Sequence, residues 1–212
     1  MGDVHTAIDA RTREFIEAQR MFFVGSAPLD RGGHVNVSPK GGDSFRILGP
    51  ATVAYLDYTG SGVETIAHLR ENRRIVVMFC AFEGPPNIVR LHGRGEVIAP
   101  QHAEFPALLE LFNPDPGVRS IIRIHLDRIS SSCGYAVPRY RYEGQRKQLA
   151  EWASRKGEDG LRKYRAEKNS TSLTVCRVLN RTNSRASVYI LASPKPDHQY
   201  VKRFLTYWIY MR

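Results

Sequence analysis

The stretch VAYLDYTGSGVETIAHLREN, residues 53–72, places a strand, a glycine-rich turn and a helix in direct succession. β-Branched and aromatic residues over 52–56 are typical of a strand, and 57–62 have the composition of a turn. The helix is predicted over 63–72, where the apolar residues at helical spacing are Val63, Ile66, Ala67 and Leu69. Two glycines therefore lie just before a helix N-terminus.

Outward from this stretch, the chain alternates short apolar segments with turn residues. Six strands are predicted, at 21–24, 34–38, 52–56, 75–82, 87–98 and 118–129. Gly93 and Gly95 allow a bend or bulge in the strand at 87–98. Helices are predicted over 5–20, over 101–113 with an interruption at Pro106, and over 145–167 as two pieces around Gly157. Closely spaced strands with few long helices favour a mainly-β protein, a β-barrel with small flanking helices, over a parallel doubly wound sheet.

The composition is that of a globular protein, with 42% hydrophobic and 25% charged residues and a net charge of +10. Charges of both signs alternate through the body, which argues against a nucleic-acid interface there. Three cysteines without a CxxC pair indicate reduced thiols and a cytoplasmic location. We expect no transmembrane segment or signal peptide. The histidines lack metal-ligand spacing, so no metal site is expected.

The C-terminal segment differs from the rest of the chain. From Cys176 to the end there are seven basic residues and one acidic residue. We expect one domain over 1–172 and a divergent basic tail over 173–212 that does not fold independently. One hypothesis is that this tail derives from a retained intron or an altered reading frame, and the alternative is a basic extension that contacts a membrane or RNA.

Residues 59–65, TGSGVET, have the composition of an anion site. Glycines let the backbone approach an anion, and free amides at a helix start attract negative charge. Ser61 and Thr65 add hydroxyl donors. The alternative is a simple helix cap, in which Ser61 caps the helix and Glu64 completes a capping box.

Residues 34–41, HVNVSPKG, form a second candidate segment. His34, Asn36 and Ser38 alternate onto one face of a strand, and Lys40 follows just beyond. Such a row can hydrogen-bond a flat polar heterocycle while Lys40 meets its phosphate. The alternative is a solvent-facing edge strand that ends in a turn.

Taken together, these segments resemble the pyridoxamine 5′-phosphate oxidase-related family, in its uncharacterised fungal and bacterial branch. The resemblance covers roughly residues 5–172. It is carried by Phe22-Phe23-Val24, residues 34–41 and 53–72, MFCAFEGPPNIVRLHGRGEV (78–97) and SCGYAVPRY (132–140). It implies a split β-barrel and a homodimer that binds FMN at its interface. The cofactor-binding positions it implies are Asn36, Ser38, Lys40, Thr59, Ser61, Gly62 and Thr65.

The resemblance implies a flavin-dependent oxidoreductase with an unknown small-molecule substrate. Departures from the vitamin B6 enzyme, among them Val63-Glu64-Thr65 where that enzyme has Ser-Arg-Lys, argue against true pyridoxamine phosphate oxidation. Some related barrels bind the deazaflavin F420 or haem, so both stay alternatives to FMN. A non-catalytic flavin or haem carrier is the second hypothesis, and a basic binding module acting through the tail is the third. No catalytic acid or base is predicted.

Overall fold

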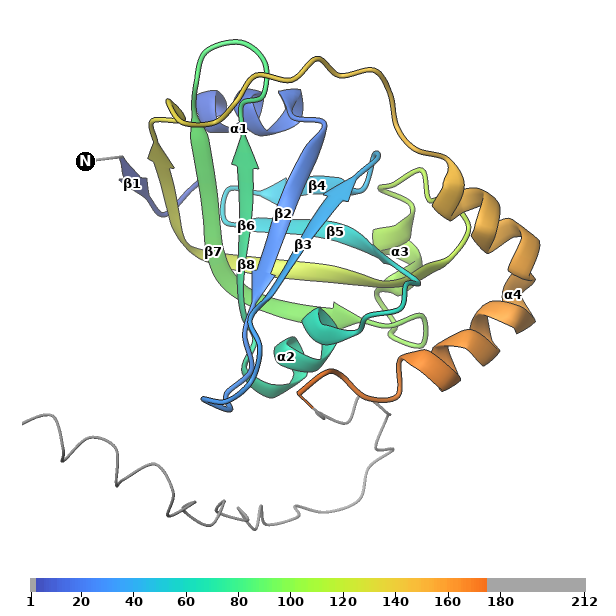
Figure 1. Cartoon of the computed structure of the whole chain (residues 1–212). Helices are drawn as coiled ribbons and strands as arrows, with labels where there is room; N and C mark the ends of the chain where they lie inside the picture. Colours follow the sequence, from blue (N-terminus) through green and yellow to red (C-terminus); the bar gives the residue numbers. More distant parts are fainter. Residues whose placement is uncertain (1–2, 175–212) are drawn as a thin grey trace, which may run out of the picture. The chain divides into compact units, whose positions relative to one another are not determined.

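The computed structural model describes residues 3–174, which form a curled antiparallel sheet with helices outside it (Figure 1). In chain order the elements are β1 (Val4–His5), α1 (Ala10–Ala18), β2 (Met21–Ser26), β3 (Asn36–Gly41), β4 (Phe45–Gly49), β5 (Thr52–Tyr58), α2 (Glu64–Asn72), β6 (Arg74–Cys80), β7 (Ile88–Ile98), α3 (Phe105–Leu109), β8 (Val118–Ser132) and α4 (Gln148–Lys168). The predicted tail over 173–212 lies almost wholly outside the described residues. The prediction for this segment therefore stays a prediction.

The sheet runs in the order β3-β2-β6-β7-β8-β5-β4, with β1 added beside β8. Every pair of neighbouring strands is antiparallel. Although four strands separate β2 from β4 in this order, the rings of Phe22 and Phe45 lie 5.2 Å apart. The sheet therefore curls until its two ends face each other without pairing. The fold is the mainly-β split barrel that the sequence predicts.

Strand β5 is buried on both faces because it separates two apolar clusters. Val53 and Tyr55 point into the barrel, where the main core contains Phe22, Phe79 and Leu91. Ala54 and Leu56 point the other way, into a smaller cluster with Ile98, Phe112 and Ile121 that α3 helps to cover. Successive side chains of a strand point to opposite faces, so one apolar run serves both clusters.

Strand β7 bends where the sequence predicts a bulge. Its register with β8 shifts between His92 and Gly93. A Cβ at Gly93 would overlap the backbone oxygen of His125 on β8. Glycine is thus required by the close approach of two backbones rather than by an unusual dihedral angle.

Most predicted elements are confirmed, with shifted ends. The helix predicted around Gly157 is kinked there, with φ of 64° at this glycine. Strand β3 begins at Asn36 and extends to Gly41, later than the predicted 34–38. Strand β4 was not predicted from the sequence. It is only five residues long, it follows Gly42 closely, and it ends at Gly49.

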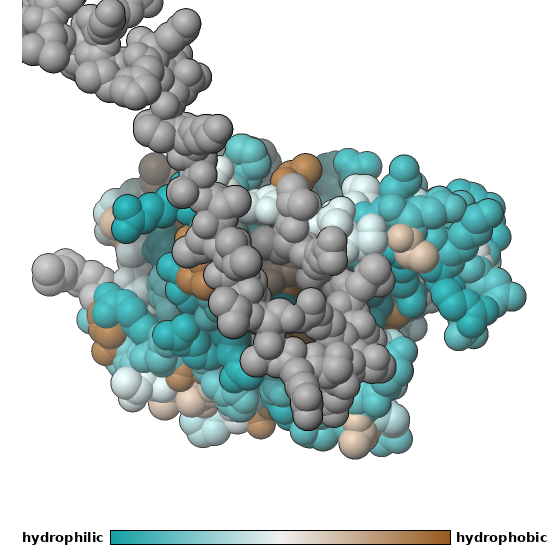
Figure 2. Space-filling model, turned by 90° about the horizontal axis from the view of Figure 1, so that it is seen from below, coloured by the Kyte–Doolittle hydropathy of each residue, from teal (hydrophilic) through white to brown (hydrophobic). Residues whose placement is uncertain are grey.

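The described surface is polar in the view from below, the end at which α2 lies. Hydrophilic residues dominate that face, and hydrophobic ones are scattered over it (Figure 2). Among residues 3–174, no helix is long and apolar enough to cross a membrane.

Candidate functional site

The candidate site lies where edge strand β3 runs beside the segment that joins β5 to α2. Asn36 Nδ2 donates to Thr65 Oγ1 at 3.0 Å, and Ser38 Oγ donates to Asn36 Oδ1 at 3.3 Å. Further along β3, Lys40 Nζ lies 3.9 Å from Asp57 Oδ1 at the end of β5. Four of the predicted cofactor-binding residues are thus brought to one side of the barrel. Since Thr65 Oγ1 accepts the bond from Asn36, its proton stays available to a ligand.

The two faces of β3 differ from the usual pattern of an edge strand. Asn36, Ser38 and Lys40 are half-buried, and their side contacts the end of β5 and the first turn of α2. The opposite face is exposed, and it includes Val37 at 65% and, just before the strand, Val35 at 71%. Exposed apolar residues on an edge strand are a feature that a binding partner can cover.

Thr59 is buried and already makes several hydrogen bonds. Its backbone N–H and its hydroxyl both donate to Gly117 O, at 2.8 and 2.9 Å. The hydroxyl also accepts a bond from Arg165 Nε at 2.8 Å. This predicted site residue therefore anchors the start of the glycine loop, residues 59–63 between β5 and α2, to neighbouring segments.

The helix start does not use Ser61 as a cap. Helix α2 begins at Glu64, its N-cap is Val63, and no side chain accepts a bond from its first turn. The capping-box interpretation of Ser61 and Glu64 is therefore wrong. Ser61 and Gly62 are exposed in the loop before the helix, and the N-terminal amides of the helix are left uncapped by side chains.

A buried ion pair lies directly beneath this loop. Asp57, 2% exposed, accepts from Arg119 Nε at 2.8 Å and from Ser120 Oγ at 3.3 Å. Arg119 Nη1 also donates to Gly62 O at 3.0 Å and to Asn169 Oδ1 at 2.7 Å. One guanidinium thereby links the end of β5, the loop and the end of α4.

Two residues of the C-terminal helix region complete the site, and sequence reasoning missed both. Asn169 Nδ2 donates to Gly60 O at 3.0 Å, and Arg165 bonds Thr59 as described above. Burial, and next the nearby Arg119, lower the pKa of Arg165, which nevertheless stays protonated. Both residues are more than a hundred positions from the loop, so no local pattern signals their role.

The acidic side chain closest to the loop is turned toward the end of the described chain. Glu64 Oε1 accepts from the backbone N–H of Leu173 at 3.4 Å, and its other oxygen lies against Gly62. Three cations, Lys40, Arg119 and Arg165, thus accompany the two carboxylates of Asp57 and Glu64. The local balance is positive, which suits an anionic ligand.

A large groove with a volume of about 1430 Å³ is lined by two of the predicted cofactor-binding residues, Lys40 and Thr59, whereas Asn36, Ser38, Ser61, Gly62 and Thr65 are not among its lining residues. Lys40, Thr59 and Gly60 line one part of it, and residues 140–146 of the extended segment before α4 line another. It is large enough for a ligand of cofactor size, since such pockets commonly measure about 300–1,000 Å³.

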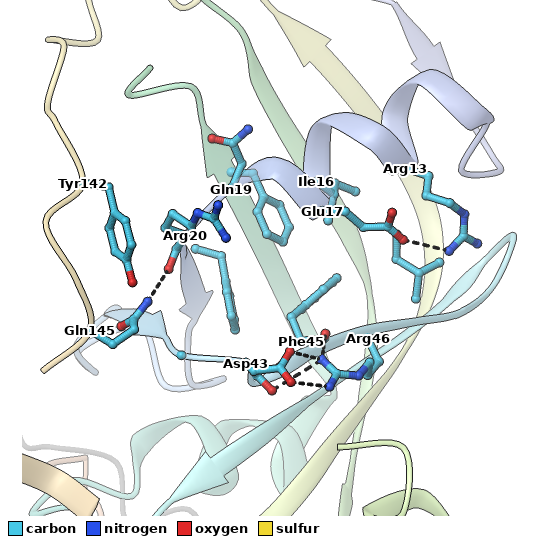
Figure 3. Close-up of a pocket in the computed structure, with 14 residues that line it drawn as sticks. Arg13, Ile16, Glu17, Gln19, Arg20, Asp43, Phe45, Arg46, Tyr142 and Gln145 are labelled. Carbon is cyan, nitrogen blue, oxygen red and sulfur yellow. Dashed lines mark hydrogen bonds and ion pairs between the residues drawn. The ribbon is translucent and has the colours of Figure 1, made fainter. Parts of the chain in front are cut away.

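A smaller cavity of about 520 Å³ lies between α1 and β4, over the rings of Phe22, Phe45 and Phe79 (Figure 3). Four of the charged groups at its rim form two ion pairs, Arg13 with Glu17 and Arg46 with Asp43, while Arg20 lies over the ring of Tyr142. Because most of these charges are already paired, we favour the groove over this cavity as the ligand site. Among residues 3–174, no cluster of three or more potential metal ligands occurs.

These features define a split-barrel protein with a positively charged, donor-rich site beside a glycine loop. The chain belongs to the pyridoxamine 5′-phosphate oxidase family, whose sequence profile matches residues 8–133, more than half of the chain. The pyridoxamine 5′-phosphate oxidase family protein ustO of Aspergillus flavus is 42% identical over 138 residues. That alignment covers 63% of this chain and 55% of the relative, so the chain spans about half of that protein's length.

Solved structures resemble the chain less closely. HupZ of Group A Streptococcus is 24% identical with a TM-score of 0.47, and the match covers 57% of this chain and 91% of HupZ. An FAD binding protein from Mycobacterium smegmatis is 12% identical with a TM-score of 0.42, and the match covers 60% of this chain and 97% of that protein.

Proposed function

We propose that this chain is an FMN-binding flavoprotein of its family and acts as a flavin-dependent oxidoreductase in the cytoplasm. The observation that carries the proposal is the row Asn36, Ser38, Lys40 of β3 facing the end of β5 and the start of α2. Membership of the family supports it independently. When bound, FMN would supply the electron transfer, while the protein would supply binding and orientation.

The residues present fit a terminal phosphate. Ser61 and Thr65 have hydroxyl protons to donate, and Lys40 contributes an ammonium that is held near Asp57 without a short contact. Amides at the start of α2 add further donors. A phosphate monoester carries close to two negative charges at neutral pH and takes up several such donors at once.

Asn36 and Ser38 lie on the same face of β3 as Lys40, and we assign the amide of Asn36 and the hydroxyl of Ser38 to polar edges of the flavin. Flat heterocycles are commonly oriented by a few such groups. The substrate would lie in the groove that Lys40 and Thr59 line. F420 and haem stay alternatives, which chemical identification of the bound ligand would reveal.

We also propose a homodimer with the cofactor at its interface. Strand β3 is the end strand of the sheet, and its exposed valines form an apolar strip directly behind the candidate site. Open strand edges and exposed apolar residues are features that a second subunit commonly covers.

The experiment begins with protein produced in riboflavin-supplemented cells, followed by mass spectrometry of the copurified ligand. We then measure the affinity of the apoprotein for FMN and for riboflavin, which lacks the phosphate. Lys40→Met should weaken FMN binding by about tenfold or more and leave riboflavin binding unchanged, because a charged hydrogen bond is lost. Lys163→Met, which removes an exposed lysine of α4, is the matched control.

Turnover with NAD(P)H then separates an enzyme from a carrier. A colourless preparation with no preference for FMN over riboflavin would refute the proposed cofactor. Bound FMN without turnover by any electron donor would support the carrier hypothesis instead.

A further inference from the structure

The carbonyl groups of the glycine loop converge on one bonded pair of side chains. Gly60 O accepts from Asn169 Nδ2 and Gly62 O accepts from Arg119 Nη1, both at 3.0 Å. Asn169 and Arg119 are themselves joined by a hydrogen bond of 2.7 Å. The two carbonyls therefore point to the same side of the loop, toward α4 and β8.

The planarity of the peptide bond determines where the corresponding amides point. In a trans peptide the N–H lies opposite the C=O, and no peptide bond among the described residues is cis. The N–H groups of Ser61 and Val63 must then point away from Asn169 and Arg119. Within residues 3–174, neither amide donates to a protein acceptor. The two amides flank Gly62, and amides turned to one side of a loop attract an anion.

We infer that Asn169 is a positioning residue for the phosphate of the cofactor, acting through the orientation of the loop peptides. It holds Gly60 O on one side of the loop so that the Ser61 and Val63 amides face the phosphate on the other. This inference rests on the proposed function, since it concerns the same site. Asn169 itself does not touch the ligand.

An asparagine is suited to this position because both ends of its amide are used. The nitrogen donates to Gly60 O while the oxygen accepts from Arg119. The residue is 7% exposed and ends α4, with its backbone N–H bonded to Arg165 O at 2.9 Å. A leucine of similar size offers neither bond, and an aspartate keeps the acceptor but presents a repelling oxygen to Gly60 O.

The test compares Asn169→Leu and Asn169→Asp with the wild type. For each we measure the dissociation constants of FMN and riboflavin, and the ¹⁵N–¹H shifts of Ser61 and Val63 on titration with inorganic phosphate. Gln148→Glu, an exposed position at the other end of α4, controls for added charge on this helix. A melting temperature of each apoprotein reports on folding separately.

Both Asn169 variants should lose at least about tenfold in FMN affinity, the cost of one hydrogen bond in a charged network, with riboflavin affinity unchanged. The phosphate-induced amide shifts should disappear in both, while Gln148→Glu should behave as the wild type. If Asn169→Leu keeps the wild-type preference for FMN, the inference is overturned even though the cofactor proposal stands. Loss in Asn169→Asp alone would point to charge repulsion and would also overturn it. A wild-type protein without preference for FMN would overturn both proposals.

Discussion

Replacing Asp57 with asparagine removes the negative charge that the cations beneath the loop share. The carboxylate is 2% exposed, 2.8 Å from Arg119 Nε and 3.9 Å from Lys40 Nζ. Breaking a buried ion pair costs about 3–5 kcal/mol, and asparagine still offers one oxygen to Arg119, so we expect a loss of about 3 kcal/mol in the free energy of unfolding. For a domain of this size the melting temperature should fall by about 6–12 °C.

The assay is urea unfolding of the apoprotein, extrapolated to water, at low and high salt. The matched control is Asp43→Asn, because Asp43 also pairs with an arginine, Arg46, but its side chain is 58% exposed. An exposed pair contributes less than about 1 kcal/mol and weakens in salt, whereas the effect of Asp57→Asn should persist at high salt. If Asp57→Asn costs no more than the control, the buried pair does not stabilise the junction of β5, β8 and the loop.

Two further predictions concern stability. Burial lowers the pKa of His68, although Glu71 and Glu64 oppose the shift. In the unfolded chain His68 takes up a proton near pH 6.5, whereas in the folded protein it does so only at lower pH. The free energy of unfolding should therefore fall as the pH drops from about 7.5 to about 5.5, and it should fall less steeply in His68→Gln. Equal slopes for the two proteins would contradict this. Gly93→Ala should lower the free energy of unfolding in urea by roughly 2 kcal/mol, because its Cβ would displace the β8 backbone. The control Gly49→Ala has open space around its Cβ and should stay near the wild type. Equal losses in the two variants would contradict the close approach at Gly93.

The fold could be predicted from the sequence wherever local pattern and tertiary position agree. The apolar run at 75–82 predicts a strand, and the glycines at 93 and 95 predict a bend in the next strand. Both predictions succeed because strand period and glycine chemistry are local properties. Strand β4 could not be predicted in this way. Its five residues alternate weakly, and it becomes a strand only because β5 provides a pairing edge.

The site residues, too, were predictable where their chemistry is visible in a short segment and unpredictable where it depends on the tertiary structure. Asn36, Ser38, Lys40 and Thr65 were predicted because their chemistry is visible in short segments, and the structure brings them together. The orientation of β3 was less predictable. Nothing local says that its valines face outward, since that follows from how the curled sheet presents its edge.

The least predictable feature is the one on which the proposed anion binding depends most directly. A glycine loop can turn either its carbonyls or its amides toward a ligand, and the residues of the loop do not decide between them, because glycine permits both. Here the choice follows from Arg119, which Asp57 orients, and from Asn169, which ends a helix more than a hundred residues away. A chain with the same TGSG segment but no donor at position 169 would keep the motif without fixing the peptide orientation. The motif alone therefore does not determine the peptide orientation, which Arg119 and Asn169 fix here through their bonds to Gly62 O and Gly60 O.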